Sequence, residues 1–368
     1  MSIYYGLIIF TFFLMVIVFP KRVKINELGN SLSKSEKIYF TLFAVVLVAI
    51  AANRGITVGT DLLNYNAFFT EVNQKGILNI NEFPFELGYT LLNQLISWIT
   101  GDFRTVLLVV ILVFLLGFYR LASTLSYQIG LSCFMLVTLD FYTSSFNIIR
   151  QYLAIGIIFI AIPYLLNNKK AKYILLILFA TSFHMTAGIM LLAIPLYKIK
   201  FNRKFVAISI IVTLLAFLFV PRIVSLASIV IPKFSFYTTM RYFTGGFRIF
   251  SFFNFIFFTV LLIGSRIVIN KYSKTATLPR YYDLFSYLLL IGCEILFLSN
   301  RFILFDRVAN YFTIFSIFLV PNTICLIKNK QIRVLIQFLF IILCFAYFFL
   351  VYTLKPESNG INPYIFWR

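Results

Sequence analysis

Acidic residues are rare in this chain, and many of them gather in one polar segment. Only 12 of the 368 residues are Asp or Glu, and five of these 12 fall between Asn53 and Phe103: Asp61, Glu71, Glu82, Glu86 and Asp102. Nearly everything around this segment is hydrophobic enough for a membrane interior. An acid-bearing polar segment in so apolar a chain indicates more than a passive connector, so we look for chemistry there.

The segment opens with a short loop that combines opposite charges with glycine. Arg54 and Gly55 are followed by Gly59 and Asp61, and Tyr65 comes one helical turn later. Two glycines permit tight turns, so the arginine and the aspartate can converge on a ligand. The alternative is an ordinary loop with a surface ion pair, which stabilises little. We favour the ligand-binding interpretation because polar residues and glycines are dense there.

Glu86 begins a second feature, an amphipathic stretch that continues to about Trp98. Its leucines and Ile99 recur at helical spacing and form one apolar face, which predicts a helix lying on the outer leaflet or dipping into it. Trp98 suits an anchor at the membrane interface. Glu86 and Tyr89 lie three residues apart on one helical face and can point at the same site. The alternative is an interfacial helix whose polar residues are solvated.

Two more polar positions interrupt apolar runs. Arg150 and Gln151 divide a run that extends from 129 to 166, and an arginine there is costly unless it reaches the interface or pairs. A guanidinium facing outward is well suited to bind a pyrophosphate. His184 is the one histidine of the chain; acid–base work or hydrogen bonding lies within its chemistry, and the alternative is a hydrogen-bonded core residue.

Cationic residues return late in the chain. Arg301 and Arg307 flank Asp306 at a predicted helix entrance, and Asn310 and Tyr311 follow. Two arginines at such a place suit an anionic ligand.

The segment 233–248 adds Arg241 and Arg248 beside tyrosines and a pair of glycines. Aromatic residues beside cations can hold sugars and phosphates. Tyrosine at an outer interface is also routine in membrane proteins. For these two arginines we favour this interpretation, an ordinary interfacial belt, over ligand binding.

The elements that position these residues are predicted to be membrane helices. The hydrophobic fraction is 61%, charged residues are 12%, and the mean hydropathy is +0.95, which places the chain in a bilayer. A spanning helix needs roughly 20 apolar residues, so the chain can hold about ten to twelve of them. We therefore predict an all-α polytopic membrane protein forming a single domain over residues 1–368, with broken or re-entrant helices.

Basic residues set the predicted orientation of these helices. The net charge is +20, but the lysines and arginines are scattered between apolar runs, which indicates loop charge on the cytoplasmic side and no nucleic-acid partner. The segment 3–19 is read as a retained first helix, because a cleaved signal would need a basic start and a small-residue cleavage site. Four single cysteines and one histidine predict neither a metal site nor disulfides.

One run conflicts with simple alternation across the membrane. Both flanks of 173–197 are basic, so a straight helix would put one basic loop outside. A pair of short half-helices turning near His184 removes the conflict and is the interpretation we favour over one helix of about 25 residues. The polar residues above, with outer loops at about 53–103 and 221–248, then face the extracytoplasmic side.

The order of these features resembles the EpsG-type proteins, membrane polymerases of bacterial exopolysaccharide, capsule and O-antigen clusters that are related in role to Wzy polymerases. The resemblance spans almost the whole chain. The residues that carry it are Arg54, Gly59, Thr60, Asp61 and Tyr65; Glu86 and Tyr89; Arg150 and Gln151; Phe183, His184, Thr186 and Ala187; Arg307, Asn310 and Tyr311; and Asn362, Pro363 and Tyr364.

The resemblance implies extracytoplasmic glycosyl transfer at a bacterial cytoplasmic membrane. A glycan on polyprenyl pyrophosphate would be the donor, and a polyprenyl-linked repeat unit the acceptor. The attacking hydroxyl needs a base, for which Asp61, Glu86 or His184 could serve. The departing pyrophosphate needs cations, a role implied for Arg54, Arg150 and Arg307. The remaining substrate-binding candidates are Tyr65, Tyr89, Gln151, Arg241, Arg301, Asn310 and Tyr311.

The leaving group is already activated, so no cofactor or metal is implied. The expected partners are the lipid-linked oligosaccharide, the bilayer, a chain-length regulator and other polysaccharide-assembly proteins. Two alternatives stay open. A flippase of the lipid-linked oligosaccharide would be expected to show internal repeats, and we find none. A membrane O-acyltransferase would use His184 as its catalytic histidine and would leave the loops of Arg54 and Arg150 unexplained.

Overall fold

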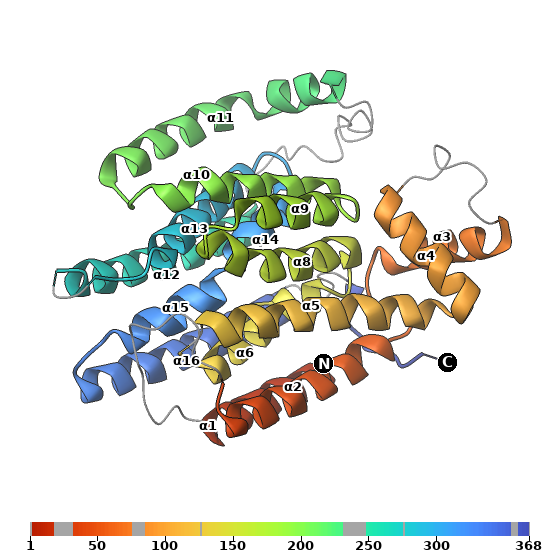
Figure 1. Cartoon of the computed structure of the whole chain (residues 1–368), viewed down its shortest axis with the longest axis horizontal. Coiled ribbons are helices and arrows are strands. Elements are labelled where there is room, and N and C mark those ends of the chain that lie inside the picture. Colours follow the sequence, from red (N-terminus) through yellow and green to blue (C-terminus); the bar gives the residue numbers. More distant parts are fainter. Residues whose placement is uncertain are drawn as a thin grey trace. The chain divides into compact units, whose positions relative to one another are not determined.

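The computed structural model describes residues 2–17, 32–75, 85–125, 127–230, 248–274, 277–354 and 360–367. Every named element within these ranges is a helix (Figure 1). The chain forms two compact units: the first unit comprises Met1–Leu191 and Ile327–Arg368, and the second unit comprises Leu192–Leu326. A single domain over residues 1–368 stays a prediction.

Among the described residues, eight helices are long and apolar enough to cross a membrane: Lys34–Ala52, Phe103–Leu125, Ile149–Leu166, Arg203–Leu226, Ile249–Tyr272, Tyr281–Leu298, Phe305–Cys325 and Lys330–Thr353. Three shorter apolar helices, at Ile3–Ile17, Ile129–Thr138 and Met185–Lys198, occupy the other apolar runs of the sequence. The predicted all-α, multi-pass membrane fold is confirmed. Within the part of the chain that the structure describes, fewer helices than the predicted ten to twelve reach spanning length, because some runs are short or broken.

The first unit is built around α8, whose membrane-spanning window is 83% buried. It lies between α5 and α9 (Figure 1). Its elements are α1 (Ser2–Ile17), α2 (Lys34–Ala52), α3 (Leu62–Lys75), α4 (Leu87–Ile99), α5 (Phe103–Leu125), α6 (Ile129–Thr138), α7 (Phe141–Ser144), α8 (Ile149–Leu166), α9 (Lys170–Thr181), the 3₁₀-helix η2 (Met185–Leu192) and α16 (Lys330–Leu354).

Glycine allows α5 and α8 to approach closely. A Cβ on Gly156 would lie 2.7 Å from the carbonyl oxygen of Val113, and a Cβ on Gly117 would overlap the main chain of Gly156. Small residues at crossings are how membrane helices gain close packing, since lipid supplies little hydrophobic drive for their association. This contact fixes α8 and the polar residues at its first turn.

The run around His184 is broken, as predicted. Helix α9 ends at Thr181, the chain turns through Ser182 and His184, and η2 begins at Met185. The Tyr173 hydroxyl donates to the carbonyl of Met190 at 2.6 Å, which is possible only if the chain folds back on itself. The pair of short half-helices is therefore confirmed, and the cytoplasmic placement of its flanks stays a prediction.

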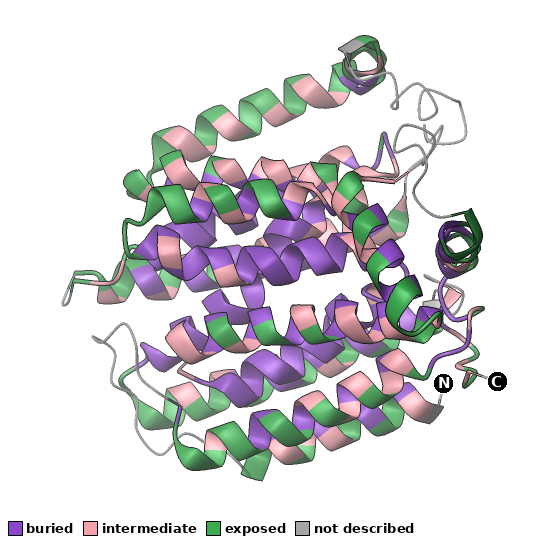
Figure 2. Ribbon diagram, turned by 45° about the vertical axis from the view of Figure 1, so that its right-hand side comes forward, coloured by how far each residue is buried: buried purple, intermediate pink, exposed green. Residues whose placement is uncertain are grey.

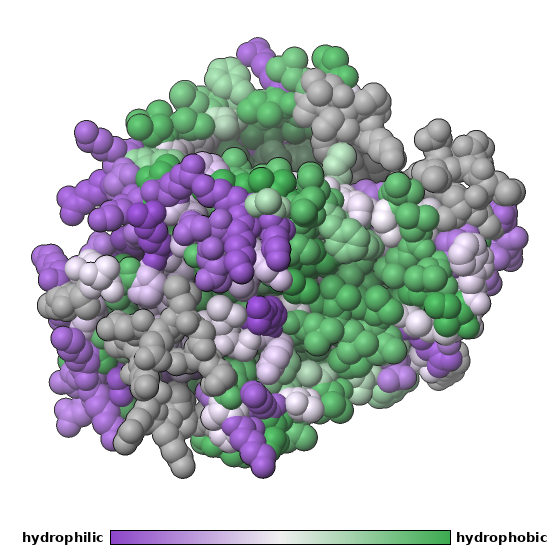
Figure 3. Space-filling view, viewed as in Figure 1, coloured by the Kyte–Doolittle hydropathy of each residue, from purple (hydrophilic) through white to green (hydrophobic). Residues whose placement is uncertain are grey.

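Helix α4 turns its apolar face outward. Leu91 is 50% exposed and Trp98 77% exposed, whereas Asn93, Gln94 and Ser97 are buried against the rest of the first unit. The apolar surface over α4 and α5 is visible in Figure 3. This polarity is the reverse of a soluble helix and fits one that meets lipid. The predicted amphipathic helix is confirmed, and its contact with the outer leaflet stays a prediction.

The second unit packs around α13. Its elements are α10 (Ala193–Lys198), α11 (Arg203–Val230), α12 (Ile249–Tyr272), α13 (Tyr281–Leu298), α14 (Phe305–Thr313) and α15 (Ser316–Cys325). The α14–α15 segment is 89% buried over its spanning window, but that of α11 is only 6% buried. Figure 2 shows α11 exposed along most of its length.

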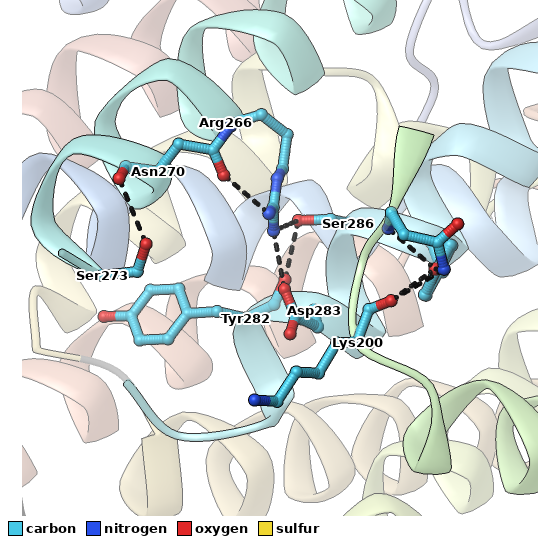
Figure 4. A network of polar contacts seen from close by, with 9 residues as sticks. Lys200, Arg266, Asn270, Ser273, Tyr282, Asp283 and Ser286 are labelled. Carbon is cyan, nitrogen blue, oxygen red and sulfur yellow. Dashed lines mark hydrogen bonds and ion pairs between the residues drawn. The ribbon is translucent and has the colours of Figure 1, made fainter. Parts of the chain in front are cut away.

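A polar clasp joins α12 to α13 in this unit (Figure 4). The Arg266 guanidinium donates to Asp283 at 2.8 Å, to Ser286 at 3.3 Å and to Asn270 at 2.9 Å. It also lies over the Phe201 ring, 4.1 Å from the ring centroid. These contacts join α12 to α13 and to the segment before α11, so we interpret the clasp as structural.

Candidate functional site

Glu86 is the centre of a polar group in the first unit. One guanidinium nitrogen of Arg150, Nη1, donates to Glu86 Oε2. The main-chain N–H of Met185 donates to Oε1 at 3.0 Å, and His184 Nδ1 lies 3.4 Å from the same oxygen. The carboxylate precedes α4, the arginine begins α8, and the histidine lies in the break after α9. Three elements distant in sequence therefore meet at one side chain.

Aromatic rings surround the guanidinium of Arg150. Its central carbon lies 4.3 Å from the centroid of Phe85, 5.6 Å from that of Tyr65 and 5.9 Å from that of Tyr89. The Arg150 Nε also donates to the Tyr65 hydroxyl at 3.4 Å. Cation–π contacts of this kind strengthen when they are shielded from water, and the Arg150 side chain is only 17% exposed. The rings hold the guanidinium in place.

Gly88 explains how α4 comes so close to the turn after α9. Its N–H donates to the carbonyl of Ser182 at 2.8 Å. A Cβ on Gly88 would lie 2.8 Å from that same oxygen and would overlap the Ser182 hydroxyl. Glycine is needed here because no side chain fits between the two segments. This contact brings Glu86 within reach of His184 and Met185.

The electrostatics of the group favour an ionised Glu86. Burial acts to raise the pKa of this carboxyl, but the nearby imidazole of His184, the charge of Arg150 and the Met185 N–H outweigh it and lower the pKa to about 2. Ion pairing and hydrogen bonds to the charged form are the usual causes of such a shift. Of the two groups beside this carboxylate, the imidazole can move protons and the guanidinium can bind an anion.

Five residues predicted from the sequence are thus brought together: Tyr65, Glu86, Tyr89, Arg150 and His184. Their roles in substrate binding and catalysis stay predictions.

Arg54 lies in a different setting. It is 2% exposed, and its guanidinium donates to the carbonyls of Ala51 and Phe146, the latter at 3.3 Å. Burial lowers the pKa of this guanidinium to about 10, which keeps it charged at neutral pH. Its predicted role in binding a ligand stays untested, and the geometry favours a structural one.

The neighbouring Asp61 is half-buried and precedes α3. Its main-chain N–H and the Thr60 hydroxyl both donate to the Asn147 side-chain oxygen at 2.8 Å. Gln151 is buried, 2% exposed, in the first turn of α8. The ligand roles predicted for Asp61 and Gln151 stay predictions.

The tail that carries Asn362, Pro363 and Tyr364 packs on the loop of Arg54. The N–H of Gly55 donates to the carbonyl of Ile365, and the N–H of Trp367 donates to that of Asn53, both at 2.7 Å. The Tyr364 hydroxyl donates to the carbonyl of Ile50 at 2.7 Å. The tail is therefore hydrogen-bonded both to the end of α2 and to the loop of Arg54 that follows it.

Other predicted site residues belong to the second unit. The Arg301 guanidinium stacks on Phe217 with 4.7 Å to the centroid. Arg307 is exposed, Asn310 is half-buried, and Tyr311 is buried. Their predicted roles in binding substrate stay predictions. Arg241 lies outside the described residues.

Asp306, also in the second unit, accepts from Arg248 at 2.7 Å and from Ser251 at 3.0 Å. The carboxylate thus joins the start of α12 to the start of α14.

Sequence reasoning missed several contributors to the Glu86 group. Phe85 precedes Glu86 and Gly88 follows it, so the run from 85 to 89 was a usable signal. The main-chain N–H of Met185 gave no signal in the sequence, because every residue except proline has such a group and only the fold decides where it points.

Glu294, in the second unit, was also missed, although an acid within an apolar run is visible in a sequence. It lies inside the spanning helix Tyr281–Leu298, where ionisable groups are costly.

Comparison with known proteins identifies the family. No curated protein and no solved structure matches the chain. The EpsG family model matches residues 37–366, a range that contains the Glu86 group and most of the tail. Because this match covers nearly all of the 368 residues, the chain belongs to the EpsG family.

Proposed function

We propose that this protein extends a surface polysaccharide at the outer face of the bacterial cytoplasmic membrane. It would transfer the growing glycan from polyprenyl pyrophosphate to a polyprenyl-linked repeat unit. Membership of the EpsG family supports a polysaccharide polymerase in general terms. The observation that carries the proposal is the convergence of a carboxylate, a guanidinium and an imidazole at Glu86, Arg150 and His184.

The proposed reaction is a glycosyl transfer. The bond between the anomeric carbon and the phosphate oxygen breaks, and its electron pair leaves with the pyrophosphate. The acceptor hydroxyl oxygen bonds to the anomeric carbon and gives its proton to a base. Arg150 would stabilise the charge that develops on the pyrophosphate. Glu86 and His184 are the candidate bases within the group, and Asp61 remains a third.

The surface of α4 supports a lipid-linked substrate. Leu87, Leu91 and Leu95 are about half exposed on α4, the helix that Glu86 precedes. A prenyl chain lying along this apolar face would have its phosphates near the start of the helix. No cofactor is required, because the pyrophosphate is itself a good leaving group.

The test is Arg150→Ala in cells that make the polysaccharide. The variant should insert normally and block chain extension, so that lipid-linked single repeats accumulate on the outer leaflet. Removing one preorganised charge from a transition state costs on the order of 10²-fold in rate. Arg150→Lys should retain part of the activity, because it keeps the charge and loses the planar fork.

Arg104→Ala is the matched control. Arg104 is also the second residue of a spanning helix and also pairs with an acid, Asp102, but that pair is exposed. Polymer of normal length from Arg150→Ala would contradict the proposal. Repeats trapped on the cytoplasmic leaflet would indicate a flippase instead. Normal length with missing acyl groups would indicate an acyltransferase.

A further inference from the structure

Glu86 occupies a position that suits a bound anion. Its two oxygens accept hydrogen bonds from Arg150 Nη1 and from the Met185 N–H at 3.0 Å. His184 Nδ1 lies 3.4 Å from one of them. A guanidinium N–H, a main-chain N–H and an imidazole are donors that also bind phosphate oxygens, and arginine binds carboxylate and phosphate alike. The Glu86 carboxylate therefore occupies a position in which these donors could bind a phosphate group.

We propose that Glu86 is an internal substitute for the diphosphate of the lipid-linked donor, which displaces the carboxylate from Arg150, His184 and the Met185 N–H when it binds. This inference rests on the proposed function. It adds that the free enzyme holds its anion site closed with its own acid, and that donor binding releases that acid.

The site keeps its shape when the carboxylate leaves. Phe85, Tyr65 and Tyr89 hold the Arg150 guanidinium independently of Glu86. Gly88 fastens α4 to the carbonyl of Ser182 through the main chain. The Glu86 side chain makes no capping hydrogen bond to α4, so its departure does not unwind the helix.

Displacement would also change Glu86 as a base. Held by its donors, the carboxyl has a pKa of about 2, and so weakly basic a group accepts a proton poorly. Once its donors have turned to the diphosphate, the contacts that lower its pKa are gone and the pKa would rise. The released carboxylate could then take the proton of the acceptor hydroxyl as that oxygen bonds to the anomeric carbon. Donor binding would thus precede activation of the acceptor.

The test measures pyrophosphate binding to the full chain in lipid nanodiscs by calorimetry. Glu86→Gln should bind inorganic pyrophosphate at least about tenfold more tightly than the wild type, because a neutral amide competes less for the donors and the binding-competent state is more populated. Arg150→Gln should lose the binding. Glu71→Gln removes an exposed acid that pairs with Lys75 on α3, and its affinity should equal that of the wild type.

Inorganic phosphate serves as the second probe. A diphosphate site should show a clear preference for pyrophosphate in Glu86→Gln, whereas equal affinity for both anions would overturn the assignment to a diphosphate. Unchanged or weaker pyrophosphate binding by Glu86→Gln, in protein whose melting curve shows it folded, would overturn the displacement itself. If Arg150→Ala still blocks polymer in that case, the proposed function survives and only this inference fails.

Discussion

At the scale of single residues, the side chain of Glu86 has the most demanding environment of the candidate site. It is mostly buried, with a side-chain exposure of 22%, and it pairs with both Arg150 and His184. Burial alone would favour the neutral acid, so the low pKa measures how strongly the donors act. The pairing must therefore stabilise the folded protein wherever Glu86 is ionised.

This predicts a specific dependence of stability on pH. The pKa of Glu86 is about 2 in the folded protein and about 4.3 in an unfolded chain. The contribution is thus complete above about pH 5 and is lost as the pH falls toward 2. At pH 7 it is on the order of 3 kcal/mol, since each unit of pKa shift corresponds to about 1.4 kcal/mol.

Melting curves of the wild type and Glu86→Gln in detergent test this prediction. The wild type should melt at a higher temperature at pH 7, and the difference should shrink steadily as the pH is lowered from 5 to 3. A difference that stays constant over this range would show that the carboxylate is not stabilised by its donors.

At the scale of elements, the site depends on how α4 docks against the break after α9. The contact is a main-chain hydrogen bond between Gly88 and Ser182, with no space for a side chain. The arginine that completes the group is placed by another close approach, between α5 and α8 at Gly117 and Gly156. Two glycine contacts therefore position the segments that carry Glu86, His184 and Arg150.

Gly88→Ala should separate α4 from the turn and pull Glu86 away from His184. Overpacking typically costs about 1–3 kcal/mol, so the melting temperature should fall and polymer synthesis should be lost. Gly6→Ala is the control, because a Cβ on Gly6 in α1 meets nothing within 4 Å. Alanine at that helical position should leave the protein unchanged or slightly more stable. Equal behaviour of the two variants would contradict the proposed docking.

At the scale of the whole molecule, the C-terminal tail, residues 360–367, contacts several separate elements of the first unit. The Tyr4 hydroxyl on α1 donates to the carbonyl of Ile361 at 2.8 Å, and the Gly59 N–H donates to that of Gly360 at 2.9 Å. Trp367 packs near Phe103 at the start of α5. Residues 360–367 thus hold α1, α5 and the loop of Arg54 together.

Deleting the chain from residue 360 onward should therefore destabilise the first unit. Several hydrogen bonds would be lost, each with a net value of about 1 kcal/mol, and buried main-chain donors such as the N–H of Gly55 would lose their partners. The melting temperature and the amount of protein in membranes should both fall. Ile365→Ser is the control, because that side chain is 42% exposed. A deletion that melts like the control would show that the tail contributes no stability.

The amino-acid sequence by itself determined the membrane class, the helical runs and most of the chemistry-bearing residues. Apolar length and basic loops are local properties, so helices such as Phe103–Leu125 could be predicted from composition. The break at His184 was also predictable, because basic residues on both flanks favour placing both flanks on the same, cytoplasmic side of the membrane. Glu86, Arg150 and His184 stood out because each is polar within or beside an apolar run.

Only the tertiary structure decided which of these residues lie together. Arg54 and Arg150 looked equivalent as ligands for an anion, yet one binds main-chain carbonyls and the other binds Glu86. Periodicity within one helix carries no information about the partner that another helix presents. The pairing arises from contacts between distant segments, through glycine approaches and backbone donors such as the Met185 N–H, and these exist only once the chain has folded.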